Sequence, residues 1–472
     1  MQSPDNSTPN TGQDATLAAQ LKQLATRAFG LLGAGGTDNQ AAQRMAIATF
    51  GIRVGGAALA YLSQVVLARM LGAYDYGVFA VAWTFVIILG VMACGGFSSS
   101  ASKFIPKYRE VGDPDSLRGF ISTSRRSVFL IGSTIAGAGI GVIALLQPVI
   151  DPSYVVPLSV ALHALPFFSY AMAQDGIARS YDWPFLAMLP TYIWRPAALL
   201  VIILIFLVFA GKATATTAAM AAVLSAFLVA AYQHVHLNQR LKPVLPRGPK
   251  KTDVRLWILI SLPMLVVDGF LQLITSADVI MVSFFEEPDQ VAIYFAASKT
   301  LALVHFVYFA VRAASAHRFS RYLHSDDMTG LAAYVRQAVH WTFWPSVGAG
   351  IGLLIIAPWL LELFGSGFAD GYLLIAVLMI GVLARASIGP ADALLTMTGL
   401  QKTCAVIYGT TFVLNVVLNL IFIPWLGLMG AAVATSCAIL FETTALAFAA
   451  KRKLNITTFI LPLMFQARNA AA

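Results

Sequence analysis

The chain has 472 residues, of which 58% are hydrophobic and 11% are charged, and its formal net charge is +9. Soluble domains carry roughly 25% charged residues, so this composition excludes a water-soluble globular protein and indicates a chain that uses lipid as its solvent. The apolar runs are continuous rather than alternating, which excludes an outward-facing β-barrel and predicts an all-α polytopic membrane protein.

About twelve transmembrane helices are expected, because each long apolar run is close to the roughly 20 residues that a bilayer requires. The helices expected in the first half of the chain are 45–70, 77–99, 124–147, 154–174, 185–210 and 213–236. Those expected in the second half are 256–284, 290–316, 336–362, 370–394, 403–424 and 427–450.

A polar segment with several prolines separates these two sets of six helices. It covers 237–255 and is expected to be an irregular cytosolic linker. The expected bundles are 43–236 and 256–453, with a cytosolic extension at 1–42 and a cytosolic tail at 454–472. Because six is an even number, both bundles start from the same side of the membrane, which predicts parallel repeats about an axis along the membrane normal.

A short internal repeat is consistent with this duplication. Residues 137–141 and 348–352 both read GAGIG, and Arg125 and Arg336 each precede their copy by twelve residues. Repeats of this kind place a substrate path between two halves of a transporter. The small residues themselves are expected mainly to let neighbouring helices pack closely.

The basic residues predict the orientation of the chain. They gather at 103–126, 240–255 and 451–453, which fall on one face if successive helices alternate in direction, whereas acidic residues gather at 286–289 on the opposite face. Positive charge marks the cytosolic side, so both termini are expected in the cytoplasm of a multi-pass protein of the bacterial inner membrane. This bias accounts for the net charge and requires no nucleic acid as a partner.

Enzyme signatures are missing from the sequence. The three cysteines fall in expected helices, the seven histidines are scattered, and no Cys/His spacing indicates a metal site. No nucleotide-binding loop, catalytic carboxylate pair or Ser-His-Asp set is apparent, and the loops are too short for a catalytic domain. The sequence therefore predicts neither an enzyme nor a bound cofactor.

Cations inside the apolar runs are the first candidates for function, because a charge within a membrane is costly unless it lines a cavity or has a partner. Several such cations suit an anionic substrate, since Arg binds phosphate through a planar fork. Arg312 and Arg385 have an alternative, which is to extend toward the cytosolic interface. The candidate substrate-binding residues are Arg53, Arg195, Lys299, Arg312 and Arg385.

Intramembrane acids are the candidates for proton or sodium coupling, because protonation or ion binding neutralises a buried carboxylate. They are Asp268, Asp278 and Glu442. The alternative for each is a structural ion pair, which for Asp278 would be with Lys299 and for the other two with an arginine.

Three segments resemble a known family. Residues 415–435, NVVLNLIFIPWLGLMGAAVAT, are similar to a pattern near the end of bacterial polysaccharide flippases. Residues 67–82, LARMLGAYDYGVFAVA, and 103–113, KFIPKYREVGD, resemble that family's first extracellular turn and first cytosolic loop. The resemblance covers about 45–450 and is to the polysaccharide branch of the multidrug/oligosaccharidyl-lipid/polysaccharide exporter superfamily.

The resemblance implies two six-helix bundles that form a V-shaped cavity and work by alternating access. The implied cargo is an undecaprenyl-diphosphate-linked oligosaccharide, carried from the cytosolic to the outer leaflet for lipopolysaccharide or exopolysaccharide synthesis. The implied partners are this lipid-linked oligosaccharide, the bilayer, and polysaccharide polymerase and chain-length proteins. Arg53 matches by position an arginine of relatives that flip the peptidoglycan precursor, although those relatives have two further helices.

Two other functions stay open from the sequence. A cation-coupled multidrug antiporter of the same fold would favour acids in the first helix, whereas 45–70 contains no Asp or Glu. A membrane enzyme such as an oligosaccharide ligase or polymerase would require a large periplasmic loop, and none is expected.

Overall fold

The structure is a computed structural model that describes residues 38–325 and 327–460. It divides into two compact units, Met1–Gly55 and Gly56–Ala472, and each is described by itself. Of the first unit, residues 38–55 are described, and they form the start of one helix. Most of the expected extension 1–42 and the tail beyond residue 460 lie outside the described residues.

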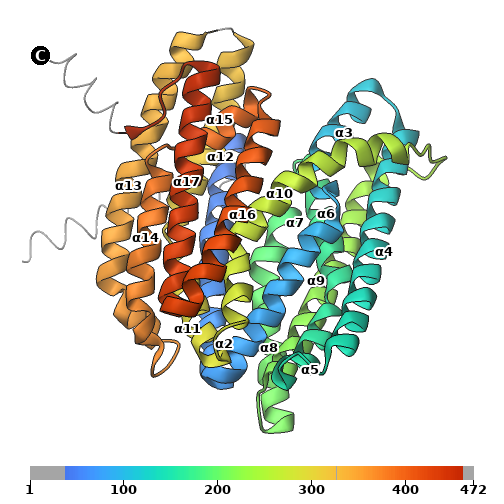
Figure 1. The fold of residues 1–472 in the computed structure, drawn as a ribbon. Coiled ribbons are helices and arrows are strands. Elements are labelled where there is room, and N and C mark those ends of the chain that lie inside the picture. Colours follow the sequence, from blue (N-terminus) through green and yellow to red (C-terminus); the bar gives the residue numbers. More distant parts are fainter. Residues whose placement is uncertain (1–37, 326, 461–472) are drawn as a thin grey trace, which may run out of the picture. The chain divides into compact units, whose positions relative to one another are not determined.

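The described chain is built of helices (Figure 1). Those before the linker are α2 (Asp38–Cys94), α3 (Phe97–Val111), α4 (Pro114–Leu146), α5 (Pro152–Leu162), α6 (Leu165–Ser180), α7 (Pro184–Leu189), the π-helical turn η1 (Pro190–Trp194), α8 (Arg195–Ala210) and α9 (Ala215–Val244). Those after it are α10 (Val254–Ser283), α11 (Pro288–Leu301), α12 (His305–His324), α13 (Met328–Glu362), the 3-10 turn η2 (Phe368–Gly371), α14 (Tyr372–Ala386), α15 (Ala391–Met397), α16 (Gln401–Leu426) and α17 (Leu428–Leu454).

These helices confirm an all-α polytopic membrane protein. Within the described residues, nine helices are long and apolar enough to cross a membrane, or up to eleven if two bent pairs each form one span. The first candidate, Gly51–Val111, has 61 residues and would be about 90 Å long as one rod, three times the thickness of a hydrocarbon core. Gly72 breaks it with φ 78° and ψ 166°, at a position between the helices expected at 45–70 and 77–99.

The bent pairs are α5 with α6, at 44°, and α11 with α12, at 45°. They cover the helices expected at 154–174 and 290–316. Each pair turns at a break of a few residues, so a single apolar run supplies two helical pieces with different directions.

The segment after the second expected helix is helical rather than a loop. It forms α3, which starts after Gly96 in the left-handed conformation and ends at Gly112 in the same conformation. Its apolar residues, such as Phe104, are buried on one face, while Lys103 and Lys107 are exposed on the other. Amphipathic spacing therefore stabilises a helix where the resemblance implied the first cytosolic loop.

The linker is also shorter than expected. Helix α9 continues to Val244, so the first eight residues of 237–255 are helical and the non-helical part is 245–253. Leu237 and Leu241 are buried, which shows that the packed face of α9 extends beyond the apolar run. Arg118 at the start of α4 donates hydrogen bonds to the Pro246 and Pro249 carbonyls, at 2.9 and 2.8 Å, and so holds the connection in place.

The GAGIG repeat falls at equivalent places in two long helices, α4 and α13. Both helices follow an N-cap aspartate: Asp113 accepts from the Ser116 backbone at 3.0 Å, and Asp327 from the Gly330 backbone at 2.8 Å. The hydrogen bond from the Ser116 backbone lowers the pKa of the Asp113 carboxyl. Repeat-related helices thus share their start signal as well as their glycines.

The central glycine of each copy packs against a neighbouring helix. A Cβ on Gly139 would lie 2.8 Å from the Leu162 side chain, and one on Gly350 would lie 3.0 Å from the Met379 sulfur. By contrast, a Cβ on Gly137 or Gly348 would meet open space. The expectation that these glycines serve close helix packing is confirmed for the central pair.

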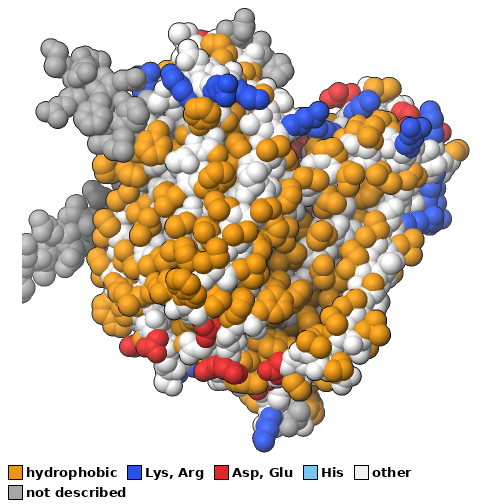
Figure 2. All heavy atoms as spheres, viewed as in Figure 1, with side chains coloured by type: hydrophobic (Ala, Val, Ile, Leu, Met, Phe, Trp, Pro, Cys, Tyr) orange, Lys and Arg blue, Asp and Glu red, His pale blue; other side chains and the backbone are white. Residues whose placement is uncertain are grey.

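The unit Gly56–Ala472 is electrostatically polarised along its helices (Figure 2). In this view, Lys and Arg gather at the end that carries α3 and the linker, and Asp and Glu gather mainly at the end that carries the α10–α11 connection. This is the distribution that the basic and acidic segments of the sequence predict.

Candidate functional site

Four charged residues and a tyrosine form a cluster in the C-terminal half. Arg312 on α12 lies 2.7 Å, Nε to Oδ2, from Asp392 on α15. The Tyr308 hydroxyl donates to the other carboxylate oxygen of Asp392 at 2.6 Å. A cation and a neutral donor therefore satisfy both oxygens of an acid that is only 3% exposed.

A second ion pair completes this charge cluster. Arg385 on α14 lies 3.2 Å from Glu442 on α17, and its guanidinium lies 5.1 Å from the centre of the Tyr308 ring. Tyr308 thus connects the two pairs, through its hydroxyl on one side and its ring on the other. Both Glu442 carboxylate oxygens and the Arg385 Nε are buried without a hydrogen-bond partner. The two arginines are balanced by two acids, and Glu442 adopts the structural pairing that the sequence left open.

A different arrangement surrounds Asp278 on α10. Its Oδ2 accepts from Thr435 on α17 at 2.6 Å and from Tyr294 on α11 at 3.3 Å, and its Oδ1 accepts from Asn419 on α16 at 3.4 Å. Asn415, one turn before Asn419, donates to Thr435 at 3.3 Å. We call Asp278, Tyr294, Asn415, Asn419 and Thr435 the Asp278 network.

The Asp278 network contains one acid and only neutral partners. Lys299, the expected alternative partner, instead lies over the Phe295 ring with its Nζ 4.6 Å from the ring centre. Across the described chain no ion pair joins Asp278 to Lys299. The Asn419 Oδ1 is also buried there without a hydrogen-bond partner. The Asp278 carboxylate and the Asn419 amide oxygen therefore belong to one buried site, and both have lone pairs without a donor. Such a site is suited to a proton or a small cation.

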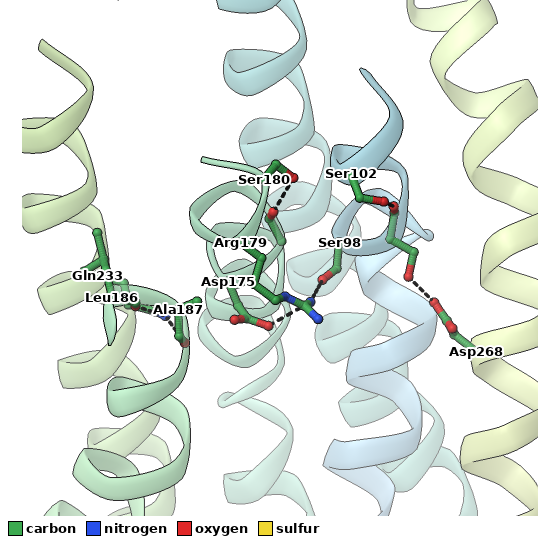
Figure 3. A network of polar contacts seen from close by, with 11 residues as sticks. Ser98, Ser102, Asp175, Arg179, Ser180, Leu186, Ala187, Gln233 and Asp268 are labelled. Atoms are coloured by element: carbon green, nitrogen blue, oxygen red, sulfur yellow. Dashed lines mark hydrogen bonds and ion pairs between the residues drawn. The ribbon is translucent and has the colours of Figure 1, made fainter. Parts of the chain in front are cut away.

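Asp268 has a third environment, at the contact between α3 and α10. The Ser99 hydroxyl donates to its carboxylate at 2.6 Å, and close by the Ser261 hydroxyl donates to Ser100 at 2.7 Å. Figure 3 shows that the same part of α3 is also held from α6, where Arg179 pairs with Asp175 at 2.9 Å and donates to Ser98 at 3.1 Å. Asp268 thus contributes to a polar contact between the two halves of the sequence.

Two candidate cations lie over aromatic rings. The Arg195 guanidinium, at the first residue of α8, is 5.1 Å from the Phe168 ring centre and 5.9 Å from the Trp83 ring centre. Lys299 lies over Phe295 as described above. Neither cation forms an ion pair with an acid in the described residues, so the ring faces partly replace water around each charge. Arg53 belongs to the unit Met1–Gly55, and its role stays a prediction.

Sequence reasoning missed four neutral members of these sites, Tyr308, Thr435, Tyr294 and Ser99. Tyr308 lies one helical turn before Arg312, and that spacing was a usable signal. Asn415, Asn419 and Thr435 all belong to the 415–435 segment, whose first and last residues are Asn415 and Thr435. The segment that carried the family resemblance is thus the one that surrounds Asp278. Ser99 and Tyr294 have no sequence signal, because only the packing of separate helices brings them to their partners.

Comparison with known families gives two overlapping matches. Residues 44–322 match the family described as "Polysaccharide biosynthesis protein", and residues 263–421 match the family described as "MatE". The second match covers α10 from residue 263 onward and all of α11 to α15. It therefore includes most of the charge cluster. A search of curated proteins finds no match.

Three solved structures with the same fold are distant from this chain in sequence. A multidrug resistance MATE family transporter of the MOP superfamily, in an inward-facing conformation, has a TM-score of 0.71 and 15% identity, with 84% of this chain and 94% of that chain covered. The lipid II flippase MurJ, in an inward closed conformation, has a TM-score of 0.66 and 16% identity, with coverages of 86% and 87%. A MOP superfamily transporter from Pyrococcus furiosus, whose binding pocket is described as having reverse polarity, has a TM-score of 0.57 and 15% identity, with coverages of 89% and 96%.

Proposed function

Because its match covers more than half of the chain, the protein belongs to the polysaccharide biosynthesis protein family, and we propose that it flips an undecaprenyl-diphosphate-linked oligosaccharide across the bacterial inner membrane. The protein is a multi-pass membrane transporter or flippase with the fold of the MOP superfamily. The proposal adds the cargo, the direction from the cytosolic to the outer leaflet, and a role in surface polysaccharide synthesis.

The observation that carries the proposal is the contrast among the intramembrane cations. Arg312 and Arg385 are balanced by acids, whereas Arg195 and Lys299 have no acidic partner in the described structure. Uncompensated cations within a membrane favour an anionic cargo, and a diphosphate offers several acceptor oxygens to a guanidinium fork. The sugars and the diphosphate would follow the cationic path while the polyprenyl chain stays in lipid.

Alternating access is the mechanism that suits this fold, with 43–236 and 256–453 as the moving halves. At the acidic end, Tyr76 on α2 packs edge-on against Phe295 on α11, with ring centres 5.8 Å apart. At the basic end, Asp268 on α10 accepts from Ser99 on α3. We infer that transport opens one of these contacts while the other stays closed.

The test is flipping by the purified full chain in proteoliposomes that contain a fluorescent undecaprenyl-diphosphate oligosaccharide. Arg195→Gln should reduce the initial rate at least tenfold, because the diphosphate loses a charge-assisted hydrogen bond worth about 1.5–3 kcal/mol. Arg195→Lys should retain an intermediate rate, since it keeps the charge but loses the fork. Arg452→Gln, the same change at the exposed end of α17, serves as the control. A normal rate for Arg195→Gln in well-folded protein would remove Arg195 from the cargo path.

We further infer that Asp278 couples flipping to a proton or sodium gradient. The support is its burial among neutral partners, together with the unpaired Asn419 oxygen beside it. Asp278→Asn should make flipping independent of the gradient while cargo binding persists, and Asp370→Asn, at an exposed acid, should keep the gradient dependence. Unchanged gradient dependence in Asp278→Asn would exclude this site. Asp268 and Glu442 remain secondary coupling candidates, because each already has a direct structural partner.

The alternative function is a cation-coupled multidrug antiporter. It is favoured by the MatE match over 263–421, which includes Asp278. Vesicles that hold the purified protein distinguish the two: a flippase moves the lipid-linked oligosaccharide and leaves cationic dyes in place, whereas an antiporter does the reverse.

The proposed location is the inner membrane, with both termini in the cytoplasm and with polysaccharide polymerase and chain-length proteins as partners. The basic end of the helices supports this orientation (Figure 2). A cytosol-specific reporter fused after Lys453 should be active, and periplasmic activity at that site would reverse the topology.

A further inference from the structure

A second cationic site lies within the N-terminal half, away from the contacts between the halves. It is a cavity of about 440 Å³ between α4, α6, α9 and the linker. Its cationic lining consists of Arg118, Arg125, Arg126, Lys242, Arg247 and Lys250. In Figure 2 blue side chains gather over the upper part of α4 and the adjacent linker.

The charge in this cavity is largely uncompensated. None of its lining residues is acidic. Arg118 pairs with the nearby Asp115, and in the described structure the other five lining cations form no ion pair. Six cations from two helices and a linker repel one another at close range, so their collection around one hollow favours an anion.

A chain of hydrogen bonds fixes one of these cations, Arg125. The Tyr170 hydroxyl on α6 contacts the His234 ring on α9 at 2.7 Å, and the other ring nitrogen of His234 contacts the Asn238 amide at 2.9 Å. The Asn238 oxygen then accepts from Arg125 Nη1 at 2.7 Å. Three helices thus orient one guanidinium, and such positioning is characteristic of a binding group rather than a freely moving surface charge.

The fixed guanidinium still has unused donors. Arg125 Nε and Nη2 are shielded from solvent and have no hydrogen-bond partner in the described structure. A buried donor without a partner costs free energy, and a ligand oxygen would remove that cost. On the rim of the cavity, Lys250 Nζ lies 3.1 Å from the Ser122 hydroxyl, so another cation and a hydroxyl are available at the mouth.

We propose that this cavity binds a phosphate group at the cytosolic surface of the membrane. Phosphate matches the site because its several oxygens take one fork from Arg125 and single donors from Lys250 and Arg247. The group belongs either to the headgroup of an anionic phospholipid of the inner leaflet or to a free phosphate compound of the cytosol. The bound phosphate connects α4 with the linker residues 245–253, and so stiffens the connection between the two six-helix halves.

The test uses the purified full chain in a neutral detergent and follows its thermal unfolding midpoint. The probes are short-chain phosphatidic acid, short-chain phosphatidylcholine and inorganic diphosphate. Phosphatidic acid should raise the midpoint saturably and phosphatidylcholine should not. A saturable effect of diphosphate as well shows that the phosphate group alone suffices, and an effect of diphosphate without one of phosphatidic acid assigns the site to a cytosolic compound.

Variants link the effect to the cavity. Arg125→Gln should raise the half-saturating concentration on the order of tenfold, because a charge-assisted fork is lost. The double variant Arg247→Gln, Lys250→Gln tests the exposed rim without touching the helix interior and should weaken binding as well. Arg336→Gln is the matched control: it removes the cation at the repeat-related position of α13, which is exposed and remote from this cavity.

Three results would overturn the proposal. The first is that no phosphate probe gives a saturable shift with the unaltered chain. The second is that Arg336→Gln weakens binding as much as Arg125→Gln, which would indicate attraction by net charge alone. The third is that the rim double variant binds as the unaltered chain does.

Discussion

At the scale of single residues, neutral side chains decide what the charged ones can do. Tyr308 contacts the Asp392 carboxylate through its hydroxyl and the Arg385 guanidinium through its ring. In the same way, Thr435 and Tyr294 hold the Asp278 carboxylate without contributing a charge. The first arrangement fixes a balanced set of charges, and the second surrounds an acid with neutral partners only.

Tyr308→Phe tests the first arrangement, because it removes the hydroxyl and keeps the ring. It should destabilise the protein by about 1.5–3 kcal/mol, the range for a hydrogen bond to a charged group. The thermal unfolding midpoint of the purified protein measures this loss. Tyr74→Phe, at an exposed tyrosine, controls for the change itself. An unchanged midpoint for Tyr308→Phe would show that the hydroxyl does not stabilise the cluster.

The Arg385–Glu442 pair gives a second test at this scale. Arg385→Met alone leaves a fully buried carboxylate without its cation, which should cost about 3–5 kcal/mol. The double variant Arg385→Met, Glu442→Gln removes both charges and should recover most of that loss. Membrane yield and the thermal unfolding midpoint measure the loss in the single variant and the recovery in the double variant. If the double variant is as unstable as the single one, the pair is not the reason for the loss.

At the scale of helices, small residues determine which elements approach each other. Gly176 on α6 lies directly against the Ser98 backbone on α3, and a Cβ there would overlap it. A Cβ on Gly96 would likewise overlap the Ser261 carbonyl on α10. These two glycines let α3 lie between α6 and α10, where its serines reach Arg179 and Asp268.

Gly176→Ala should therefore destabilise the protein by about 1–3 kcal/mol, because the obstacle is backbone and cannot rotate away. Gly137→Ala, in the GAGIG segment of α4, meets open space and should be neutral or stabilising by up to about 1 kcal/mol through better helix propensity. Thermal midpoints of the two purified variants give the comparison. Equal effects at both positions would contradict the assigned packing of α3.

At the scale of the unit Gly56–Ala472, contacts between the halves of the sequence occur toward both ends of the helices. One packs Tyr76 against Phe295, and another joins α3 to α10 through Ser100 and Ser261, whose hydroxyl oxygens are 2.7 Å apart. A transporter that works by alternating access must open at least the second contact to receive cargo from the basic end.

A disulfide across that contact should stop transport. In a chain whose own cysteines are replaced, Ser100→Cys with Ser261→Cys places two thiols within reach of each other. Oxidation should reduce flipping to the background rate, and reduction should restore it. Each single cysteine variant should be insensitive to oxidant. Full flipping activity in the oxidised, fully cross-linked protein would mean that α3 and α10 do not separate during transport.

The sequence by itself determined the membrane class, the helical content and most helix positions, because continuous apolar runs of bilayer length have few other structures available. It also located the charged candidates and the 415–435 segment, since a charge inside an apolar run is visible without any coordinates. Its errors fell at α3 and the linker, where helices continue beyond the apolar runs along amphipathic faces that carry many charges.

Only the tertiary structure decided which charges are paired. Arg312 and Asp392 are 80 residues apart in the sequence, and Arg385 and Glu442 are 57 apart. No local sequence pattern therefore indicates that these residues form ion pairs. The same packing separates Lys299 from Asp278 and leaves Arg195 over aromatic rings. Which charged residues pair depends on the distance between helices and on their rotation about their axes. Both depend on close contacts of small residues, such as Gly176 against Ser98, between segments far apart in the sequence.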